Sequence, residues 1–395
     1  MKISELLQPE VQEFIASHLE SNASELALKK NPFLSLDYIQ IINQIIAKQK
    51  AKEKLPTWFA AQNIIYPSKI SVEQTSSEKT AAYKASLVSG DSLIDLTGGF
   101  GVDCLYFAKF IKKVTHCEID EELSTIVSHN FKQLRKDNIN CIAGDSFEIL
   151  SNHKDKIDWI YIDPSRRNDL KGKVFMLKDC LPNVPELLSF YFTKSDHILI
   201  KTAPILDISA GLSELYKVKR IHIVALDNEV KELLLHWEKA NEGTPRMISV
   251  VDLESGFSPF EFEPRDEERA HSQFAEAGNY LIEPLAGILK AGAFTLFGAR
   301  FGLKKLERNS HLYTSETFTT GIPGRVFEVI QEISPKKQEI KTFFPSGKVN
   351  VICRNYVTGA EELKKKLGVK DGGEDYLIGT QTATGFKLYW CKRVQ

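Results

Sequence analysis

Residues 92–103, SLIDLTGGFGVD, constrain the fold of this chain more than any other segment. An apolar stretch leads into a turn and then into a second apolar segment from Cys104 to Ile111. The turn contains Gly98, Gly99 and Gly101. This order predicts a strand, a glycine turn and a helix, which together form the ligand-binding unit of a doubly wound parallel sheet. Glycines in such a turn reach positive φ and let a ligand lie against the backbone.

Four interpretations of this turn are possible, which differ in the ligand that the turn would bind. A Walker loop is excluded because the Gly-Lys-Ser/Thr ending is absent. A dinucleotide fingerprint would use Gly99 and Gly101, but Cys104 occupies the place of its third glycine. S-adenosylmethionine (SAM) carries an ammonium group, which favours a carboxylate at the end of the first strand, where Asp95 lies. A tight turn without any ligand is the fourth interpretation, and the following strands distinguish among them.

Carboxylates follow four successive predicted strands. After the first strand, further strands are predicted at 113–118 (KVTHCE), at 140–142 and, as an apolar run, at 157–162. These four strands end at or next to Asp95, Glu118, Asp145 and Asp163. The carboxyl ends of parallel strands meet at the edge where a doubly wound sheet binds its ligand. We therefore expect one ligand site at this edge, in preference to four unrelated loop acids or helix caps.

Further alternation of strands and helices extends the predicted sheet. Strands are expected at 197–201, 220–226 and 246–253. Helices are expected at 121–135, 184–192 and 205–216, and at 228–237 behind an Asn228 cap. The resulting fold class is α/β, with a doubly wound sheet of seven strands.

The order of acid, glycines and later acids resembles the class I SAM-dependent methyltransferases. The resemblance implies SAM as the cofactor and a Rossmann-like sheet whose seventh strand inserts antiparallel beside the fifth. It also implies that Glu118 accepts hydrogen bonds from both ribose hydroxyls and that Asp145 faces the adenine amino group. The cofactor-binding residues implied in this way are Asp95, Thr97, Gly98, Gly99, Gly101, Glu118, Ile119, Asp145, Ser146 and Asp163.

The turn after the fourth predicted strand, Asp163-Pro164-Ser165, is the expected place of methyl transfer. It resembles the Asp/Asn-Pro-Pro-aromatic motif of base amino methyltransferases, with Ser165 and Arg166 replacing the second proline and the aromatic residue. It is closer to the Asp-Pro-Pro-Arg turn of pyrimidine carbon-5 RNA methyltransferases, whose cysteine nucleophile has no counterpart in the KTAP loop. Arg166 and Arg167 are predicted either to clamp a phosphate of the substrate or to pair with nearby carboxylates.

The composition indicates a globular protein of two or three domains. Its 395 residues are 43% hydrophobic and 26% charged, which argues against disorder. There is no apolar run of membrane-spanning length and no apolar core of a signal peptide near the N-terminus, so we expect a cytoplasmic protein without membrane contact. Its six cysteines form no CxxC pair and its nine histidines no HExxH motif, so no metal site is expected.

Charge is distributed unevenly along the chain. Residues 281–395 contain 18 Lys and Arg against 11 Asp and Glu, whereas residues 1–280 contain 33 against 41. This asymmetry indicates either an anionic partner for the C-terminal part or ordinary surface charge. Lys364, Lys365 and Lys366, on a predicted helix at 360–367, are the basic residues expected to contact such a partner.

The C-terminal part resembles the THUMP-like module appended to bacterial methyltransferases. The residues that carry this resemblance are 280–292, 310–316, 323–329, 354–356 and 371–380. It implies a ferredoxin-like α+β module that presents tRNA or rRNA to the catalytic domain. The expected domains are an N-terminal helical region (1–70), a methyltransferase domain (71–255), a linker (256–279) and this module (280–395).

The predicted function is therefore a SAM-dependent RNA methyltransferase. A catalytically inactive RNA-binding protein and a methyltransferase of a small molecule or protein are the alternatives.

Overall fold

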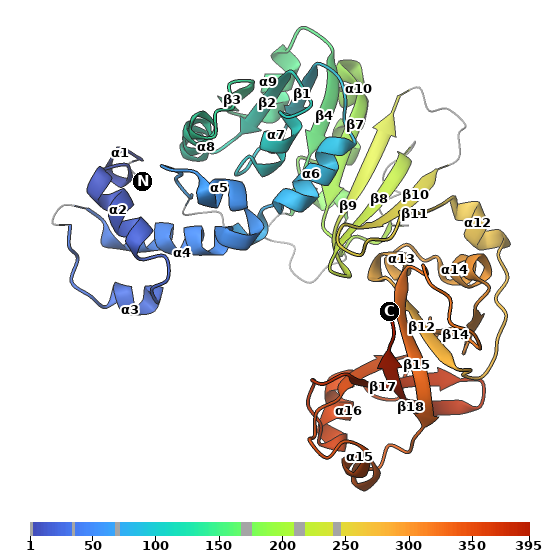
Figure 1. The fold of residues 1–395 in the computed structure, drawn as a ribbon. Coiled ribbons are helices and arrows are strands. Elements are labelled where there is room, and N and C mark those ends of the chain that lie inside the picture. The colour runs from blue at the N-terminus through green and yellow to red at the C-terminus, as the bar shows by residue number, and fades with distance from the viewer. Residues whose placement is uncertain (1–2, 34–35, 68–71, 167–175, 209–217, 240–245) are drawn as a thin grey trace. The chain divides into compact units, whose positions relative to one another are not determined.

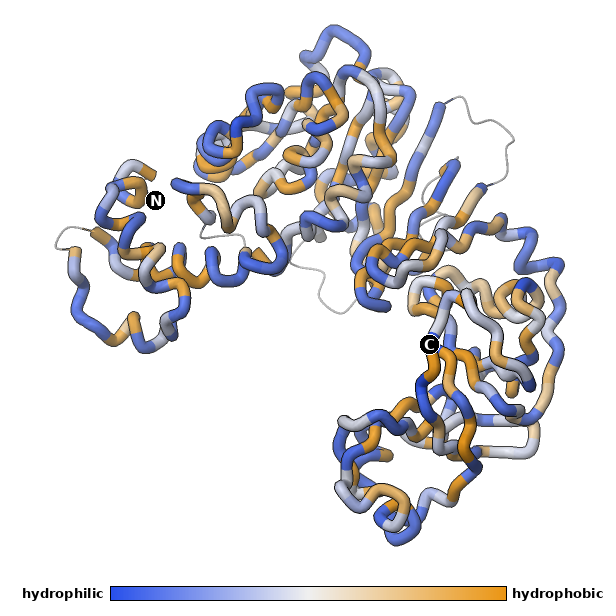
Figure 2. The backbone as a smooth tube through the Cα atoms, in the orientation of Figure 1, coloured by the Kyte–Doolittle hydropathy of each residue, from blue (hydrophilic) through white to orange (hydrophobic). Residues whose placement is uncertain are grey.

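The computed structural model describes residues 3–33, 36–67, 72–166, 176–208, 218–239 and 246–395. The chain forms two compact units. The first contains residues 1–219 and 234–244, and the second contains residues 220–233 and 245–395. Figure 1 labels their helices and strands, and in Figure 2 many of the hydrophobic stretches that build the cores fall on strands.

A nine-stranded sheet has the order β11-β10-β8-β9-β7-β4-β1-β2-β3. Within the first unit the pairings of β3 with β2, β2 with β1, β1 with β4 and β4 with β7 are all parallel. These strands are β1 (Ser92–Asp95), β2 (Lys113–Glu118), β3 (Ile139–Ala143), β4 (Ile157–Ile162) and β7 (Ser195–Thr202). Because the chain moves from β1 outward to β3 and then returns to β4, the strand order reverses between β1 and β4. Such a switch point is where doubly wound sheets bind ligands, so the predicted fold class is confirmed.

Helices connect the parallel strands, as expected. They are α7 (Val102–Phe107), α8 (Glu121–Gln133), α9 (Ser146–Asn152) and α10 (Val184–Lys194). The apolar face of α8 is buried, including Leu123, Val127 and Phe131. Between β4 and α10, β5 (Ser165–Arg166) pairs antiparallel with β6 (Cys180–Leu181) in a two-stranded ribbon. The 3-10 turn η2 (Leu177–Asp179) directly precedes β6. Most of the helix expected at 205–216 lies outside the described residues.

The described residues ahead of β1 form helices, as predicted. They are α1 (Ile3–Leu6), α2 (Pro9–Ser17), α3 (Ala23–Ala27), α4 (Tyr38–Lys54), α5 (Pro56–Ala60), the short η1 (Val72–Gln74) and α6 (Glu78–Ser86). Two buried side-chain amides attach the segment that follows α5. Asn130 of α8 bonds the backbone N–H and C=O of Ile65, at 3.0 and 2.8 Å, and Gln44 of α4 does the same for Tyr66, at 2.8 and 2.7 Å.

The helix predicted at 228–237 is wrong, because this segment is strand β9 (Glu229–Glu238). Asp227 and Asn228 both have positive φ, 53° and 58°, and connect β8 (Val218–Leu226) to β9 by a two-residue turn. Such a turn suits a hairpin, and Asp and Asn tolerate this conformation better than most residues. Residues 232–235 of β9 are consecutively buried, so the period-two alternation that marks a half-exposed strand is missing.

The sheet therefore has nine strands where seven were predicted. Segment 246–253, expected to be the seventh strand, forms β10 (Met247–Asp252), which pairs in parallel with β8. The strand that lies between β7 and β8 in the sheet order is β9. Residues 256–279, predicted as a linker, contain helix α12 (Pro264–Arg269) and β11 (Phe260–Phe262), which is an edge strand of the nine-stranded sheet.

The C-terminal part of the second unit has a seven-stranded sheet in the order β13-β14-β12-β15-β18-β17-β16. Its strands are β12 (Tyr280–Pro284), β13 (Lys304–Lys305), β14 (Tyr313–Ser315), β15 (Gly324–Glu332), β16 (Asn350–Arg354), β17 (Asp375–Thr382) and β18 (Gly385–Arg393). Its helices are α13 (Ala286–Lys290), α14 (Phe294–Phe301), α15 (Lys337–Phe343) and α16 (Ala360–Leu367). The predicted helix at 360–367 is confirmed, and the sequence also predicts a hairpin from strands at 376–379 and 387–391, which β17 and β18 form.

Two local predictions in this part are wrong. The sequence of residues 280–289 predicts a helix, but they begin with strand β12, which pairs with β14 and β15 and whose Leu281 and Ile282 are buried. The sequence of residues 294–297 predicts a short strand, but they begin helix α14, whose C-cap is Gly302 with φ of 65°. Both are short apolar runs, and periodicity alone does not distinguish a buried strand from a buried helix over so few residues.

Candidate active site

The carboxyl ends of β1, β2, β3 and β4 surround a cavity of about 660 Å³, a size typical of small-molecule sites. The predicted site residues among its lining are Thr97, Glu118, Ile119, Asp145, Ser146, Asp163 and Ser165. Pro67, Phe147, Leu181, Pro182, Asn183 and Tyr191 also line it and were not predicted. The structure thus brings together three of the four predicted carboxylates.

The glycines of the turn lie behind the cavity and are not among its lining residues. Gly98 packs on the ring of the fully buried His116, and a Cβ at this position would lie 2.4 Å from His116 Nε2. Gly101 has φ of 78°, and its Cβ would lie 2.5 Å from the ring of Phe131. Close packing therefore requires glycine at 98 and 101. The turn shapes the cavity by bringing the first strand, His116 and α8 into contact.

Asp95 is buried behind the same turn, so the structure does not place it in the cavity lining. Its Oδ1 accepts hydrogen bonds from the backbone N–H and the hydroxyl of Thr97, at 2.9 and 3.1 Å, and its Oδ2 accepts one from Cys104 Sγ at 3.2 Å. Burial raises the pKa of Asp95 to about 7 despite these bonds. Asp95 therefore holds the turn in shape, and a direct contact with a ligand ammonium stays a prediction.

Glu118 lies at the end of β2, on the cavity wall. Its Oε2 accepts a hydrogen bond from Gly99 N–H at 3.0 Å, and its Oε1 accepts one from Asp120 N–H at 2.9 Å. A carboxylate has about four acceptor positions, so each oxygen retains capacity for a ligand hydroxyl. The two backbone bonds fix the orientation of the side chain before any ligand binds.

Two apolar side chains and one acid stand near the ends of β2 and β3. Ile119 is 76% exposed and Phe147 is 45% exposed, and both line the cavity. Asp145 caps α9 through Oδ1, which accepts hydrogen bonds from Phe147 N–H at 2.7 Å and Glu148 N–H at 3.2 Å. No contact of its Oδ2 is found within the described part of the chain. This wall therefore offers an apolar surface beside one free acceptor, which suits a flat ring with an amino group.

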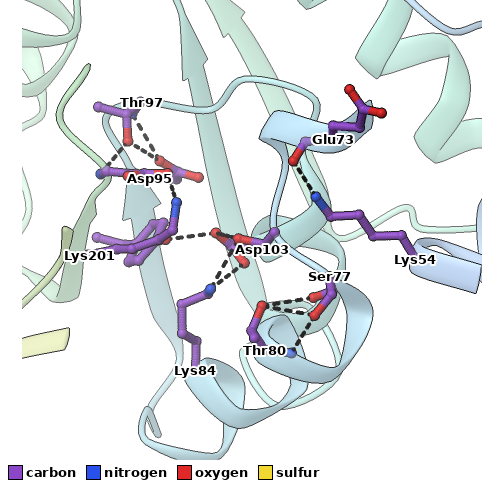
Figure 3. Close-up of polar contacts among 12 residues, drawn as sticks. Lys54, Glu73, Ser77, Thr80, Lys84, Asp95, Thr97, Asp103 and Lys201 are labelled. Carbon is purple, nitrogen blue, oxygen red and sulfur yellow. Dashed lines mark hydrogen bonds and ion pairs between the residues drawn. The ribbon is translucent and has the colours of Figure 1, made fainter. Parts of the chain in front are cut away.

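Asp163 lies at the end of β4 and is fixed from two sides. Its backbone N–H donates to Thr97 Oγ1 at 2.7 Å, and its Oδ2 forms an ion pair with Nζ of Lys201. Figure 3 shows Thr97 close to Asp95, with Lys201 nearby. Sequence reasoning missed Lys201, which ends the apolar run HILIK and lies on the neighbouring strand β7. Pro164, which follows Asp163, is buried, whereas Ser165 is exposed and lines the cavity.

The two arginines after this turn are only partly described. The backbone of Arg166 belongs to β5, and Arg167 lies outside the described residues. The phosphate clamp expected of them stays a prediction.

A buried polar network attaches the segment ahead of β1 to α7. Lys84 is fully buried, and its Nζ lies 3.2 Å from Asp103 Oδ1 and 3.1 Å from Ser76 Oγ. Asp103 Oδ2 accepts further hydrogen bonds from Ser76 Oγ at 3.0 Å and from the Tyr161 hydroxyl at 2.7 Å. Figure 3 shows Lys84 pointing toward Asp103. Ser76 therefore has a structural partner in this segment, while Ser77 caps α6 by accepting from Thr80 N–H.

The three predicted lysines lie on α16 and differ in exposure and in ion pairing. Lys364 is only 12% exposed and forms ion pairs with Glu361 and Asp371, the second at 2.6 Å. Lys365 and Lys366 are exposed, and no acidic partner of either is found among the residues that the structure describes. The exposed charge of the triplet therefore comes from Lys365 and Lys366.

In the described ranges, no three His, Cys, Asp or Glu side chains are grouped as they would be to hold a metal ion. No helix in those ranges is long and apolar enough to cross a membrane.

Three family models match successive parts of the chain. Residues 90–238 match an RNA cap guanine-N2 methyltransferase family. Residues 280–323 match a ferredoxin-like domain and residues 324–393 a THUMP-like domain.

The chain is also similar to whole proteins. A crystal structure of a putative methyltransferase from Porphyromonas gingivalis W83 is 29% identical and matches with a TM-score of 0.87 over 100% of both chains. Two uncharacterised S-adenosylmethionine-dependent methyltransferases, from Mycobacterium tuberculosis strains CDC 1551 and H37Rv, are each 21% identical over 319 residues. The match covers 80% of this chain and 84% of each relative. Together with the parallel sheet and its switch point, these matches identify the chain as a class I SAM-dependent methyltransferase with a C-terminal THUMP-like domain.

Proposed function

We propose that this methyltransferase modifies RNA and that Asp163 lies at the point of methyl transfer. The observation that carries the proposal is the position of Asp163, at the end of β4 and on the wall of the cavity. The strand tips beside it offer what SAM requires, and SAM supplies the electrophilic methyl group when bound.

The residues around the cavity fit SAM. Glu118 has acceptor capacity for two ribose hydroxyls, and its orientation is fixed by Gly99 and Asp120. Asp145 Oδ2 suits the adenine amino group, and the exposed side chains of Ile119 and Phe147 suit the faces of the adenine ring. Thr97 is the candidate residue for the methionine end, next to Asp163 at the transfer point, and Ser146 lies beside Asp145 and Phe147, which would face the adenine.

The cavity favours a nitrogen nucleophile over carbon-5 chemistry. Carbon-5 methylation of a pyrimidine needs a cysteine thiolate. The described lining contains one cysteine, Cys117, whose pKa burial raises far above its usual value, so its thiol stays protonated. Asp163, by contrast, is a partly exposed carboxylate that can accept a hydrogen bond or a proton from an amino nucleophile.

RNA is the substrate class best supported. The matched family acts on RNA caps according to its description, and a THUMP-like match follows it in the chain. Residues 281–395 carry an excess of basic residues, and Lys365 and Lys366 are exposed on α16. Arg166 and Arg167 remain candidates for a phosphate contact next to the transfer point.

Labelled SAM tests this proposal directly. The protein is incubated with methyl-labelled SAM and total cellular RNA, cell protein or a small-molecule extract. We expect label in the RNA fraction, lost after ribonuclease treatment and strongly reduced with Asp163→Asn. Label in protein or small molecules alone would reject RNA as the substrate. S-adenosylhomocysteine binding without label in any fraction would favour the inactive alternative.

A further inference from the structure

We infer that Lys201 is a positioning residue, which fixes the carboxylate of Asp163 for methyl transfer. The inference rests on the proposed function, because it assumes that Asp163 meets the nucleophile. The first observation is register: β4 and β7 pair in parallel with Ile162 opposite Ile200. The next residues along the two strands are Asp163 and Lys201, so both reach the same edge of the sheet. There Lys201 Nζ forms an ion pair with Asp163 Oδ2.

Secondly, Lys201 approaches Asp163 from the protein side, away from the cavity. Asp163 lines the cavity, whereas Lys201 is not among the described lining residues. The Lys201 side chain is 16% exposed and that of Asp163 is 37% exposed. Lys201 therefore meets Asp163 from the protein side, so it acts through the carboxylate and not by contact with the substrate.

The third observation is the set of restraints on Asp163. Thr97 Oγ1 accepts from the backbone N–H of Asp163 and itself donates to Asp95 Oδ1, so the backbone of Asp163 is tied to the glycine turn. Lys201 holds Oδ2 through a charge-assisted contact, which is stronger than a neutral hydrogen bond. No hydrogen bond or ion pair joins Oδ1 to a described residue, so Oδ1 can accept the N–H of the nucleophile. Without Lys201 the carboxylate is free to rotate about its last side-chain bond.

Lys201→Met removes the ammonium and keeps an unbranched side chain of similar reach. We expect kcat with labelled SAM and total RNA to fall about tenfold to a hundredfold, the range that misplacement of a reacting group costs. The calorimetric Kd for S-adenosylhomocysteine should change less than about twofold, and Lys201→Arg should restore part of kcat. Lys219→Met is the matched control, because Lys219 forms a comparable ion pair with Glu238. Equal kcat in Lys201→Met and the wild type would overturn the inference.

A double-mutant cycle separates positioning from a general structural role. In the Asp163→Asn background, Lys201→Met should lower kcat no further, because the group through which it acts is gone. A further tenfold loss in that background would overturn the inference. Wild-type turnover in Asp163→Asn itself would instead overturn the proposed role of Asp163.

A second readout does not depend on activity. Lys201→Met should lower the Tm of the ligand-free protein more when Asp163 is present than when it is Asn. Equal Tm losses in both backgrounds would show that the two side chains are not coupled, which contradicts the inference even if the turnover data support it.

Discussion

The hydroxyl of Thr97 accepts a hydrogen bond from the backbone N–H of Asp163 at 2.7 Å and donates one to Asp95 Oδ1 at 3.1 Å. One side chain thus connects the end of β1 to the end of β4 at the switch point of the sheet. The residue that shapes the glycine turn and the residue proposed to meet the substrate are therefore held by the same hydroxyl.

Replacing Thr97 should affect stability and turnover together. Thr97→Val keeps the shape but leaves the Asp163 N–H without its acceptor, which we expect to lower the free energy of unfolding by about 1–2 kcal/mol. The loss is measured by urea denaturation, with kcat followed in parallel. Thr97→Ser retains the hydroxyl and is the control. Equal stability of Thr97→Val and Thr97→Ser would show that the bridge contributes nothing.

Glu118→Ala should weaken binding of S-adenosylhomocysteine. Charged acceptors contribute about 1.5–3 kcal/mol per hydrogen bond, so Kd should rise by about ten- to a hundredfold. Isothermal calorimetry gives the comparison. Glu121→Ala provides the control, because Glu121 is exposed at the start of α8 and is not among the cavity lining residues. If Glu118→Ala bound as tightly as Glu121→Ala, Glu118 would be removed from the proposed cofactor site.

His116 should make stability depend on pH. Burial lowers its pKa to about 4, below the value of about 6.5 in the unfolded chain. Between these values the unfolded state binds more protons than the folded state, so the contribution of His116 to stability is present above pH 6.5 and is lost as the pH falls toward 4. The size of this loss is about 3 kcal/mol.

The difference in unfolding free energy between the wild type and His116→Gln isolates this effect. Asp95, whose pKa is raised to about 7, contributes in the opposite direction, because its stabilising effect declines as the pH rises from about 4 to 7. Asp95 is common to both proteins, so its contribution largely cancels in the difference. Urea denaturation from pH 4.5 to 7.5 should show the wild type losing stability relative to His116→Gln as the pH falls. A difference that stays constant with pH would contradict the neutral, buried histidine.

Lys365→Glu together with Lys366→Glu should weaken RNA binding and leave S-adenosylhomocysteine binding unchanged. Each lost phosphate contact reduces the slope of log K against log salt by about 0.7 on single strands, so the double variant should lose about 1.4. Filter binding over a salt series measures both quantities. Lys29→Glu with Lys30→Glu is the matched control, since both are exposed lysines of the first unit. The same affinity and slope in the two double variants would identify α16 as an ordinary solvated surface.

Local sequence determined where the strands of the first unit end. The sequence predicted β2 and β4 residue for residue. β4 (IDWIYI) is a nearly continuous apolar run, as a buried parallel strand requires, and β2 (KVTHCE) ends on an acid at its carboxyl end. The glycines were predictable for the same local reason: the turn between β1 and α7 requires positive φ at Gly99 and Gly101. The acids Glu118, Asp145 and Asp163 could therefore be assigned to one edge without any knowledge of their contacts.

Tertiary structure decided what these residues touch. Asp95 and Glu118 are each the last residue of a strand, yet packing buries Asp95 beneath Thr97 and Cys104 while Glu118 reaches the cavity. β9 is a strand because a two-residue turn brings it back beside β8, although its local pattern resembles a capped helix. Lys201 lies 38 residues from Asp163 in sequence, and only the parallel register of β4 and β7 places them together. Periodicity records which face of an element is buried, whereas a pairing between distant segments depends on how the whole sheet assembles.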